Sequence, residues 1–169
     1  LDDLNEPSDS MAVDLYRVIK PLENKGIYDY SEYEKVEKNF LIPLEIIYRN
    51  TIPEGSSVFR RLKSGEIKPE DIGLTEMPFP GMRFKSPILD VSTKLETTDR
   101  YISWDEAENI SGLLSEEIDV IKEITLSINS LISIEVERIG LVNEDGKIEC
   151  AVNERDEIVV VDVFGTPDE

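Results

Sequence analysis

The chain has 169 residues, of which 40% are hydrophobic, and it carries a formal net charge of −19 at pH 7. This length is typical of one domain with a buried core, and the acidity argues against nucleic acid as a partner, because phosphate backbones bind basic surfaces. With Cys150 as its one cysteine and no histidine, the sequence excludes an internal disulfide, a Ser-His-Asp triad and a histidine-rich zinc site. Its cysteine usage favours a cytoplasmic setting, and no apolar run approaches the roughly 18 residues that predict a membrane span.

The N-terminal part predicts a helix that stops at Gly26. Pro21 should kink or shorten its last turn, and residues 28–38 predict one short strand and a turn. The apolar residues that recur at helical spacing are Met11, Leu15, Val18, Ile19 and Leu22.

Residues 43–57, PLEIIYRNTIPEGSS, join an apolar strand to a loop of small residues. The apolar run suits a strand of roughly 5 to 7 residues, which the following proline and glycine end. Because side chains alternate along a strand, Glu45 and Arg49 would share one face, with Ile47 between them. A half-buried edge strand with two solvated charges would give the same pattern. The Gly-Ser-Ser that follows favours anion binding, since glycine allows close backbone approach and hydroxyls donate to phosphate oxygens.

Less regular structure is predicted after this strand. Residues 58–72 predict a short helix and a turn. The prolines within residues 76–91 predict a loop or an edge rather than regular structure. Residues 92–99, STKLETTD, predict a polar loop that precedes the next helix.

Two helices are predicted in the second half of the chain. Ser103 and Glu106 form a capping box for the first, which ends at Gly112. The second begins after Ser115 and runs to Gly140, about 24 residues, with one apolar stripe. The stripe consists of Ile118, Ile121, Thr125, Ile128, Ile132 and Ile139.

A final hairpin is predicted from strands at residues 147–152 and 157–164 around a four-residue turn. In this register Lys147 faces Asp162, and Glu149 is a diagonal neighbour of Asp162, about 7 to 8 Å away between backbones. Two carboxylates and a lysine on one sheet face can hold a magnesium ion and the phosphates that it neutralises. A solvent-facing hairpin would have much the same polar face, and a turn one residue shorter would change the register.

Three motifs, taken in chain order, resemble the SAICAR synthetase family. The first is Pro-Leu-Glu with Arg49-Asn50 and then a Gly-Ser pair after one extra residue, and the second is Ser-Thr-Lys-Leu-Glu with Asp99 downstream. The third is Lys-Ile-Glu at residues 147–149, followed by the strand aspartate Asp162 and a Pro-Asp turn. One departure is Val163, where many members of the family have a glutamate.

The resemblance is to the central and C-terminal part of the family, in its archaeal and eukaryotic branch. It implies an α+β fold with a mainly antiparallel sheet and two or three packing helices, related to ATP-grasp and kinase-like architectures. The N-terminal nucleotide-loop subdomain would be largely absent. Residues 1–169 would then be a single domain, truncated at both ends, that forms the substrate- and metal-binding core.

The resemblance also implies an activity. Family members use ATP to join L-aspartate to the carboxylate of carboxyaminoimidazole ribonucleotide (CAIR), which gives SAICAR, ADP and phosphate in de novo purine biosynthesis. ATP and Mg²⁺ would be the cofactors, the partners would be small molecules, and the resemblance is compatible with a homo-oligomer. The alternatives are a non-catalytic acidic module that acts through partner binding, and another ATP-using ligase or phosphotransferase of similar fold.

Site residues follow from the same resemblance. Arg49 and Ser56 would hold the CAIR phosphate or carboxylate, and Glu45 and Asp99 would share a magnesium ion at CAIR. The residues that would serve the nucleotide and its metal are Lys94, Lys147, Glu149 and Asp162.

Overall fold

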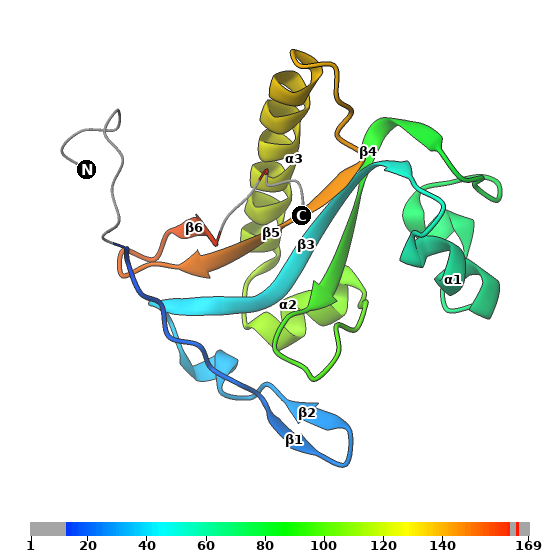
Figure 1. Cartoon of the computed structure of the whole chain (residues 1–169). Helices are drawn as coiled ribbons and strands as arrows, with labels where there is room; N and C mark the ends of the chain where they lie inside the picture. Colours follow the sequence, from blue (N-terminus) through cyan, green and yellow to red (C-terminus); the bar gives the residue numbers. More distant parts are fainter. Residues whose placement is uncertain (1–12, 163–164, 166–169) are drawn as a thin grey trace.

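The computed structural model describes residues 13–162 and residue 165. A four-stranded antiparallel sheet with the order β4-β3-β5-β6 forms its centre (Figure 1), and a two-stranded hairpin, β1-β2, lies apart from it. The elements in chain order are β1 (Leu22–Asn24), β2 (Ile27–Asp29), η1 (Tyr33–Lys35), β3 (Phe40–Ile52), α1 (Ser57–Ser64), η2 (Pro69–Ile72), β4 (Met82–Thr93), α2 (Trp104–Ser111), α3 (Ser115–Glu137), β5 (Asp145–Val152) and β6 (Ile158–Val161).

The long strand β3 runs through the centre of the sheet and pairs with β4 on one side and β5 on the other. The side chains of Ile42, Leu44 and Ile46 are completely buried on one face, so the residues between them lie on the opposite face. Glu45 and Arg49 on that second face are only 6% and 4% exposed. The predicted strand and its alternation are confirmed, but the strand has 13 residues and is central, which contradicts the alternative of an edge with solvated charges.

Helices α2 and α3 cover the apolar face of the sheet (Figure 1). The predicted long helix is confirmed, since α3 spans 23 residues and buries Ile118, Ile121 and Ile128 against the sheet. Ile139, which was predicted to continue the stripe, lies beyond the end of α3 and is 73% exposed. None of the helices within residues 13–162 is both long and apolar enough to cross a bilayer.

The predicted start and end of α2 are confirmed. The Ser103 hydroxyl accepts a hydrogen bond from the Glu106 amide at 3.1 Å, and Gly112 ends the helix with φ of 69°. The Glu106 carboxylate instead accepts a hydrogen bond from Arg100 Nη1 at 2.7 Å, so the reciprocal half of the predicted capping box does not form. An added Cβ on Gly112 would meet the Tyr33 carbonyl oxygen at 2.5 Å, so this position requires glycine for space as well as for its backbone conformation.

The predicted N-terminal helix is wrong for the residues that the structure describes. The chain is extended from Val13, forms a bridge between Arg17 and Phe40, and enters the β1-β2 hairpin. Leu15 and Val18 are mainly exposed, so a helix here would lack a surface on which to pack its apolar stripe. A short helix without such packing is marginal in water, and Pro21 weakens it further. Met11, the first residue of that stripe, lies outside the described residues.

Strand β4 confirms the edge alternative predicted for residues 76–91 and contradicts the expectation that they lack regular structure. It is a 12-residue strand from Met82 to Thr93, and it lies at the edge of the sheet. Pro87 falls within the irregularity between the Arg49–Ile88 and Thr51–Arg83 pairs. An edge position and a bulge are the places where a strand tolerates proline, which explains why the prolines did not exclude a strand.

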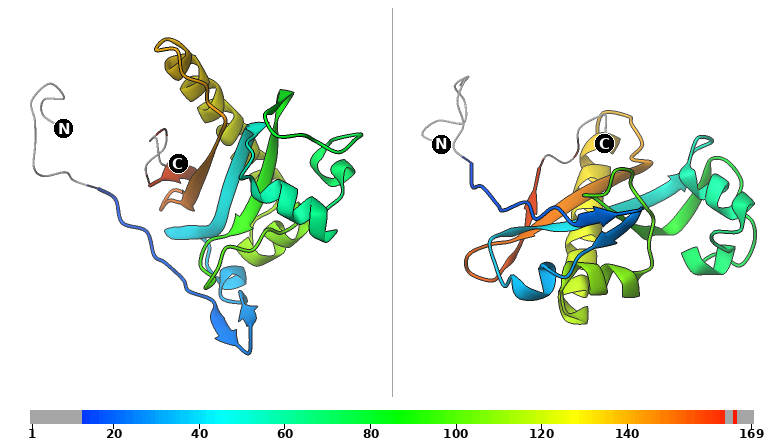
Figure 2. Two further views of the ribbon diagram at one scale, coloured as in Figure 1. Left: turned by 45° about the vertical axis from the view of Figure 1, so that its right-hand side comes forward. Right: turned by 90° about the horizontal axis from the view of Figure 1, so that it is seen from below.

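A smaller apolar cluster at the far end of β3 packs α1 and η2 against the sheet, away from α3 (Figure 2). It contains Ile52, Val58, Leu62 and Ile72. The predicted short helix and turn are therefore confirmed as α1 and η2.

The hairpin β5-β6 forms with a register one residue away from the predicted one. Val152 pairs with Ile158, and Glu149 pairs with Val161. The Asn153 side chain accepts hydrogen bonds from the amides of Arg155 and Glu157, which lengthens the turn by one residue. The predicted direct pairing of Lys147 with Asp162 is therefore wrong.

Candidate functional site

The face of the sheet opposite the helices carries a compact set of polar side chains. Strand register places them in rows across β4, β3 and β5, because directly paired residues share a face. These rows are Ser92–Glu45–Glu149, Asp90–Ile47–Lys147 and Ile88–Arg49–Asp145.

Two lysines and two carboxylates interleave in the first part of this face. The Glu45 carboxylate accepts a hydrogen bond from Lys147 Nζ at 3.0 Å and lies 3.7 Å from Lys94 Nζ. Lys94 Nζ also donates to the Glu149 carboxylate. The Ser92 hydroxyl is within 3.5 Å of the second Glu45 oxygen. The two buried carboxylates, 6% and 7% exposed as whole residues, are thus each compensated by a lysine.

Burial raises the pKa of the Glu149 carboxyl group, although the hydrogen bond and the charge of Lys94 oppose this effect. The charge of Asp162 raises the same pKa further. Asp162 has a left-handed backbone, with φ of 63°, immediately after β6. Its carboxylate therefore acts on Glu149 from beyond the end of the strand rather than from a paired position.

Burial and nearby charges also shift the pKa of the Lys147 ammonium. Burial lowers its pKa, but the hydrogen bond to Glu45 and the nearby negative charges, including Asp99, outweigh burial and raise the pKa above its ordinary value. The ammonium is thus held in its charged form within a cluster of carboxylates.

Arg49 occupies the other end of the same face and is held from several elements. Its Nη1 donates to Asp145 Oδ2 at 3.0 Å, and its Nη2 donates to the Tyr101 hydroxyl at 3.2 Å. Ser57 Oγ lies 3.4 Å from Nη2, and Asp90 Oδ2 lies 3.7 Å from it. Asp145 was missed in the sequence, although its position two residues before Lys147 on a strand could have revealed it.

The two adjacent serines at the start of α1 have different roles. Ser56 is the N-cap of α1, and its hydroxyl accepts a hydrogen bond from the Val58 amide at 3.3 Å. Ser57 instead donates to the Tyr101 hydroxyl at 2.8 Å and contacts the Arg49 guanidinium. The assignment of Ser56 to a substrate stays a prediction, and Ser57 is the serine that the fold brings to Arg49.

A pocket of about 290 Å³ lies over this polar face. It brings together four residues that the sequence predicted: Glu45, Arg49, Asp99 and Lys147. Lys94 forms a salt bridge with Glu45 of this group and donates a hydrogen bond to Glu149. Ser56 and Asp162 are not part of the lining. The remaining lining residues are Ile47, Ser92, Tyr101, Asp145 and Gly146.

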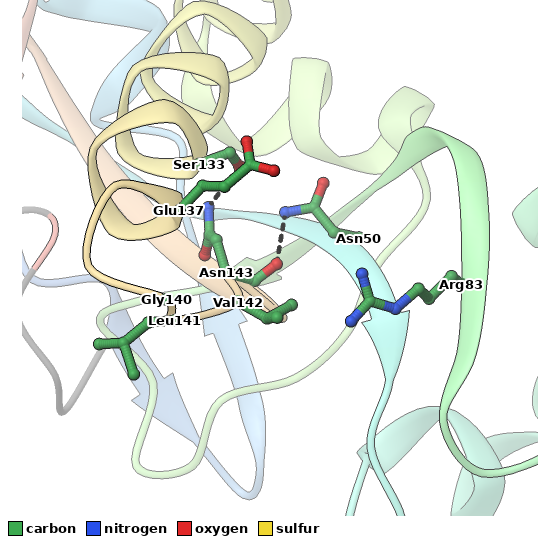
Figure 3. A pocket seen from close by; sticks show the side chains of 8 residues that line it. All are labelled: Asn50, Arg83, Ser133, Glu137, Gly140, Leu141, Val142 and Asn143. Atoms are coloured by element: carbon green, nitrogen blue, oxygen red, sulfur yellow. Dashed lines mark hydrogen bonds between the residues drawn. The ribbon is translucent and has the colours of Figure 1, made fainter.

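A second pocket, of about 430 Å³, contains none of the predicted site residues (Figure 3). Asn50 Nδ2 donates to the Asn143 carbonyl at 3.0 Å and to Asn129 Oδ1 at 2.8 Å, and Asn143 Nδ2 donates to Ser133 Oγ at 3.1 Å. The side-chain amides therefore satisfy one another's hydrogen-bonding groups, and the network anchors the loop after α3 to the end of β3.

Cys150 does not contribute a nucleophile. It is completely buried on the core face, and burial raises the pKa of its thiol to about 12. A buried thiol in apolar surroundings is unreactive.

The described residues contain no group of three or more carboxylate, cysteine or histidine side chains in a metal-binding arrangement. The carboxylates of Glu45 and Glu149 are bonded to lysines, as described above. Their oxygens are nevertheless the hard donors that Mg²⁺ prefers, and ammonium groups beside them are suited to phosphate.

A family model for SAICAR synthetase matches residues 11–169. The chain belongs to the SAICAR synthetase family. The curated relatives include the phosphoribosylaminoimidazole-succinocarboxamide synthase of Thermoplasma acidophilum, 43% identical over 89% of this chain and 52% of the relative. A protein of Archaeoglobus fulgidus to which the same name is provisionally assigned is 51% identical over 99% of this chain and 49% of its own length. The chain thus spans about half the length of the curated relatives that it matches.

Solved structures of SAICAR synthetases share the fold. One, described as the type-2 SAICAR synthetase in complex with ADP, is 26% identical with a TM-score of 0.59, covering 73% of this chain and 46% of that chain. The SAICAR synthetase of Pyrococcus horikoshii OT3 is also 26% identical, with a TM-score of 0.58, covering 73% of this chain and 47% of that chain. The predicted family and its α+β fold are both confirmed.

Proposed function

We propose that the protein containing this chain is an ATP-dependent ligase that joins L-aspartate to the carboxylate of CAIR and releases SAICAR, ADP and phosphate. Membership of the SAICAR synthetase family supports the reaction class. The observation that carries the proposal is the buried Arg49 guanidinium beside the lysine and carboxylate cluster. Its Nε has no hydrogen-bond partner among the described residues, although the residue is only 4% exposed.

A carboxylate is a poor acyl donor, so the reaction needs activation. In the proposed sequence the CAIR carboxylate oxygen attacks the γ-phosphorus of ATP, and ADP leaves with the bonding electron pair. The aspartate amine then attacks the acyl carbon, loses a proton, and phosphate leaves. This chemistry requires mainly positioning and charge neutralisation.

Arg49 supplies the anion-binding end of the pocket. A guanidinium offers several donors in one plane and suits bidentate contact with a phosphate or carboxylate. The proposed contact is with the CAIR phosphate or carboxylate, together with a hydroxyl from the start of α1. Ser57 and Ser56 are the two candidates for that hydroxyl, and Ser57 already contacts Arg49.

Lys94 and Lys147 are proposed to serve the phosphates of the nucleotide. Their ammonium groups donate hydrogen bonds to Glu149 and Glu45 in this structure. Phosphate oxygens of a bound nucleotide would take the place of these carboxylate acceptors. The relative whose structure is described as an ADP complex supports a nucleotide-binding role for this family.

The carboxylates proposed to hold magnesium are Glu45 and Asp99 beside CAIR, and Glu149 and Asp162 beside the nucleotide. The donor set fits a hard cation, since all four groups are carboxylates and Mg²⁺ takes oxygen ligands. When bound, the ion would neutralise charge on the phosphate groups.

The test is release of ADP by the complete gene product, measured with CAIR and L-aspartate each present or omitted. ADP release that depends on both substrates is expected, and Arg49→Ala should lower kcat/KM for CAIR at least tenfold. Arg60→Ala is a matched control, because Arg60 is an exposed arginine on α1. If no substrate-dependent release occurs, Arg49→Ala leaves CAIR binding unchanged and Asp162→Asn leaves nucleotide binding unchanged, the ligase proposal is wrong and a non-catalytic binding module remains.

A further inference from the structure

Tyr101 lies on the boundary between two pockets. It lines the 290 Å³ pocket that contains Arg49, and it also lines a neighbouring pocket of about 480 Å³ that contains Arg61 and Asp90. Its backbone is fixed by an antiparallel bridge to Ser92 on β4. The side chain therefore projects from a defined point beside the polar face of the sheet.

The hydroxyl of Tyr101 connects two groups in the first pocket. Ser57 Oγ donates to it at 2.8 Å, and Arg49 Nη2 donates to it at 3.2 Å. Both groups come from other elements, the first from α1 and the second from β3. One phenolic oxygen thus fixes the relative positions of a hydroxyl and a guanidinium.

The ring of Tyr101 is held from the 480 Å³ pocket. The Arg61 guanidinium lies over the ring, 4.0 Å from its centroid. Arg61 Nη1 donates to Asp90 Oδ2 at 2.5 Å, and both residues are more than nine-tenths buried. The same Asp90 oxygen lies 3.7 Å from Arg49 Nη2, so Asp90 connects the two guanidinium groups.

We propose that Tyr101 is a positioning residue that holds Arg49 and Ser57 in place for the anionic end of the substrate, with Arg61 and Asp90 fixing its ring. This inference rests on the proposed function, because it requires an anion in the first pocket. A guanidinium on a long side chain loses less conformational freedom on binding when its position is already fixed. Tyr101 acts through Arg49 and Ser57, and the sequence gives no motif that indicates it.

The test replaces Tyr101 by phenylalanine in the complete gene product, which removes the hydroxyl but keeps the ring under Arg61. The expected result is a rise of about tenfold in KM and in Kd for CAIR, with KM for ATP changed less than about twofold. Tyr16→Phe is the matched control, because the Tyr16 hydroxyl has no hydrogen-bond partner within the described part of the chain. Thermal unfolding is measured for both variants.

A double variant, Tyr101→Phe with Ser57→Ala, tests whether the two residues act together. If Tyr101 positions Ser57, the double variant should raise Kd for CAIR little more than the larger single effect, whereas independent roles would multiply the two effects. Multiplied effects would overturn the proposed connection.

The remaining outcomes separate this inference from the proposed function. If the unchanged protein binds CAIR and Tyr101→Phe alters neither its KM nor its Kd, the positioning role is wrong and the proposed function stands. A lower melting temperature with unchanged CAIR binding would also overturn it, since Tyr101 would then be only structural. If the unchanged protein binds neither CAIR nor inorganic phosphate, both proposals fall.

Discussion

Replacing Gly146 by alanine should destabilise the protein, because this glycine leaves room for a tyrosine ring. Gly146 pairs with Tyr48 across β3 and β5. An added Cβ would lie 2.4 Å from the Tyr48 hydroxyl oxygen and 2.6 Å from its Cζ. The ring cannot move freely, since Tyr48 is 3% exposed and its hydroxyl reaches Asn143 Oδ1 at 3.4 Å.

The magnitude follows from two opposing effects. Overpacking of a buried site costs about 1 to 3 kcal/mol. The backbone of Gly146 does not lie in the left-handed region, so alanine also restricts the unfolded chain and returns about 0.4 to 1 kcal/mol. The free energy of unfolding should therefore fall by up to about 2.6 kcal/mol.

The measurement is urea denaturation followed by far-UV circular dichroism. Gly55→Ala is the matched control, because an added Cβ there meets no atom within 4 Å and its φ is not positive. Tyr48→Val should remove most of the penalty of Gly146→Ala in a double-mutant cycle, since the obstructing ring is gone. Equal stability of Gly146→Ala and Gly55→Ala would refute the reasoning.

Three further predictions concern single side chains of the site and the core. Ser56→Ala should lower the free energy of unfolding by about 0.5 to 2 kcal/mol through loss of the α1 cap, whereas Ser57→Ala should mainly raise KM for CAIR; the reverse pattern in denaturation and steady-state kinetics would contradict the assignment. Burial raises the pKa of the Glu149 carboxyl group in the folded protein, so protonation of this group stabilises the fold at low pH. This contribution to the free energy of unfolding is complete below the unfolded pKa of about 4.3 and is lost as pH rises through the folded pKa. Glu149→Gln should remove that part of the pH dependence of the urea midpoint, and an unchanged profile would count against it. Cys150 should react with a thiol reagent at pH 8 only after unfolding, since burial raises the pKa of its thiol to about 12; rapid labelling of the native protein would be the contrary result.

The parts of the fold that depend on local patterns were predictable. Alternation along β3 indicated that Glu45 and Arg49 share a face, and the cap at Ser103 indicated where α2 begins. The predicted N-terminal helix failed because a helical pattern does not reveal whether a surface exists to cover its apolar stripe. The register of β5-β6 depended on hydrogen bonds of the Asn153 side chain, which the spacing of the strands does not specify.

The site was predictable to the extent that its residues lie on strands with motifs. Glu45 and Lys147 come from neighbouring strands, so period-two reasoning could find both. Tyr101, Asp90 and Arg61 reach the site from a loop, an edge strand and a helix. Their meeting is a tertiary arrangement, and no periodicity along the chain encodes it.

The two faces of β3 restrict where the chain can gain or lose a residue. One face supplies the apolar core and the other supplies Glu45 and Arg49, so an insertion within β3 would exchange the two sets and disrupt the core and the site together. The resemblance places one extra residue between Asn50 and Gly55, where β3 ends at Ile52 and the loop to α1 begins. At that point an insertion lengthens a loop and leaves both faces in register, and Ser57 still reaches Arg49. Length variation among relatives is therefore expected in this loop and not within the strand.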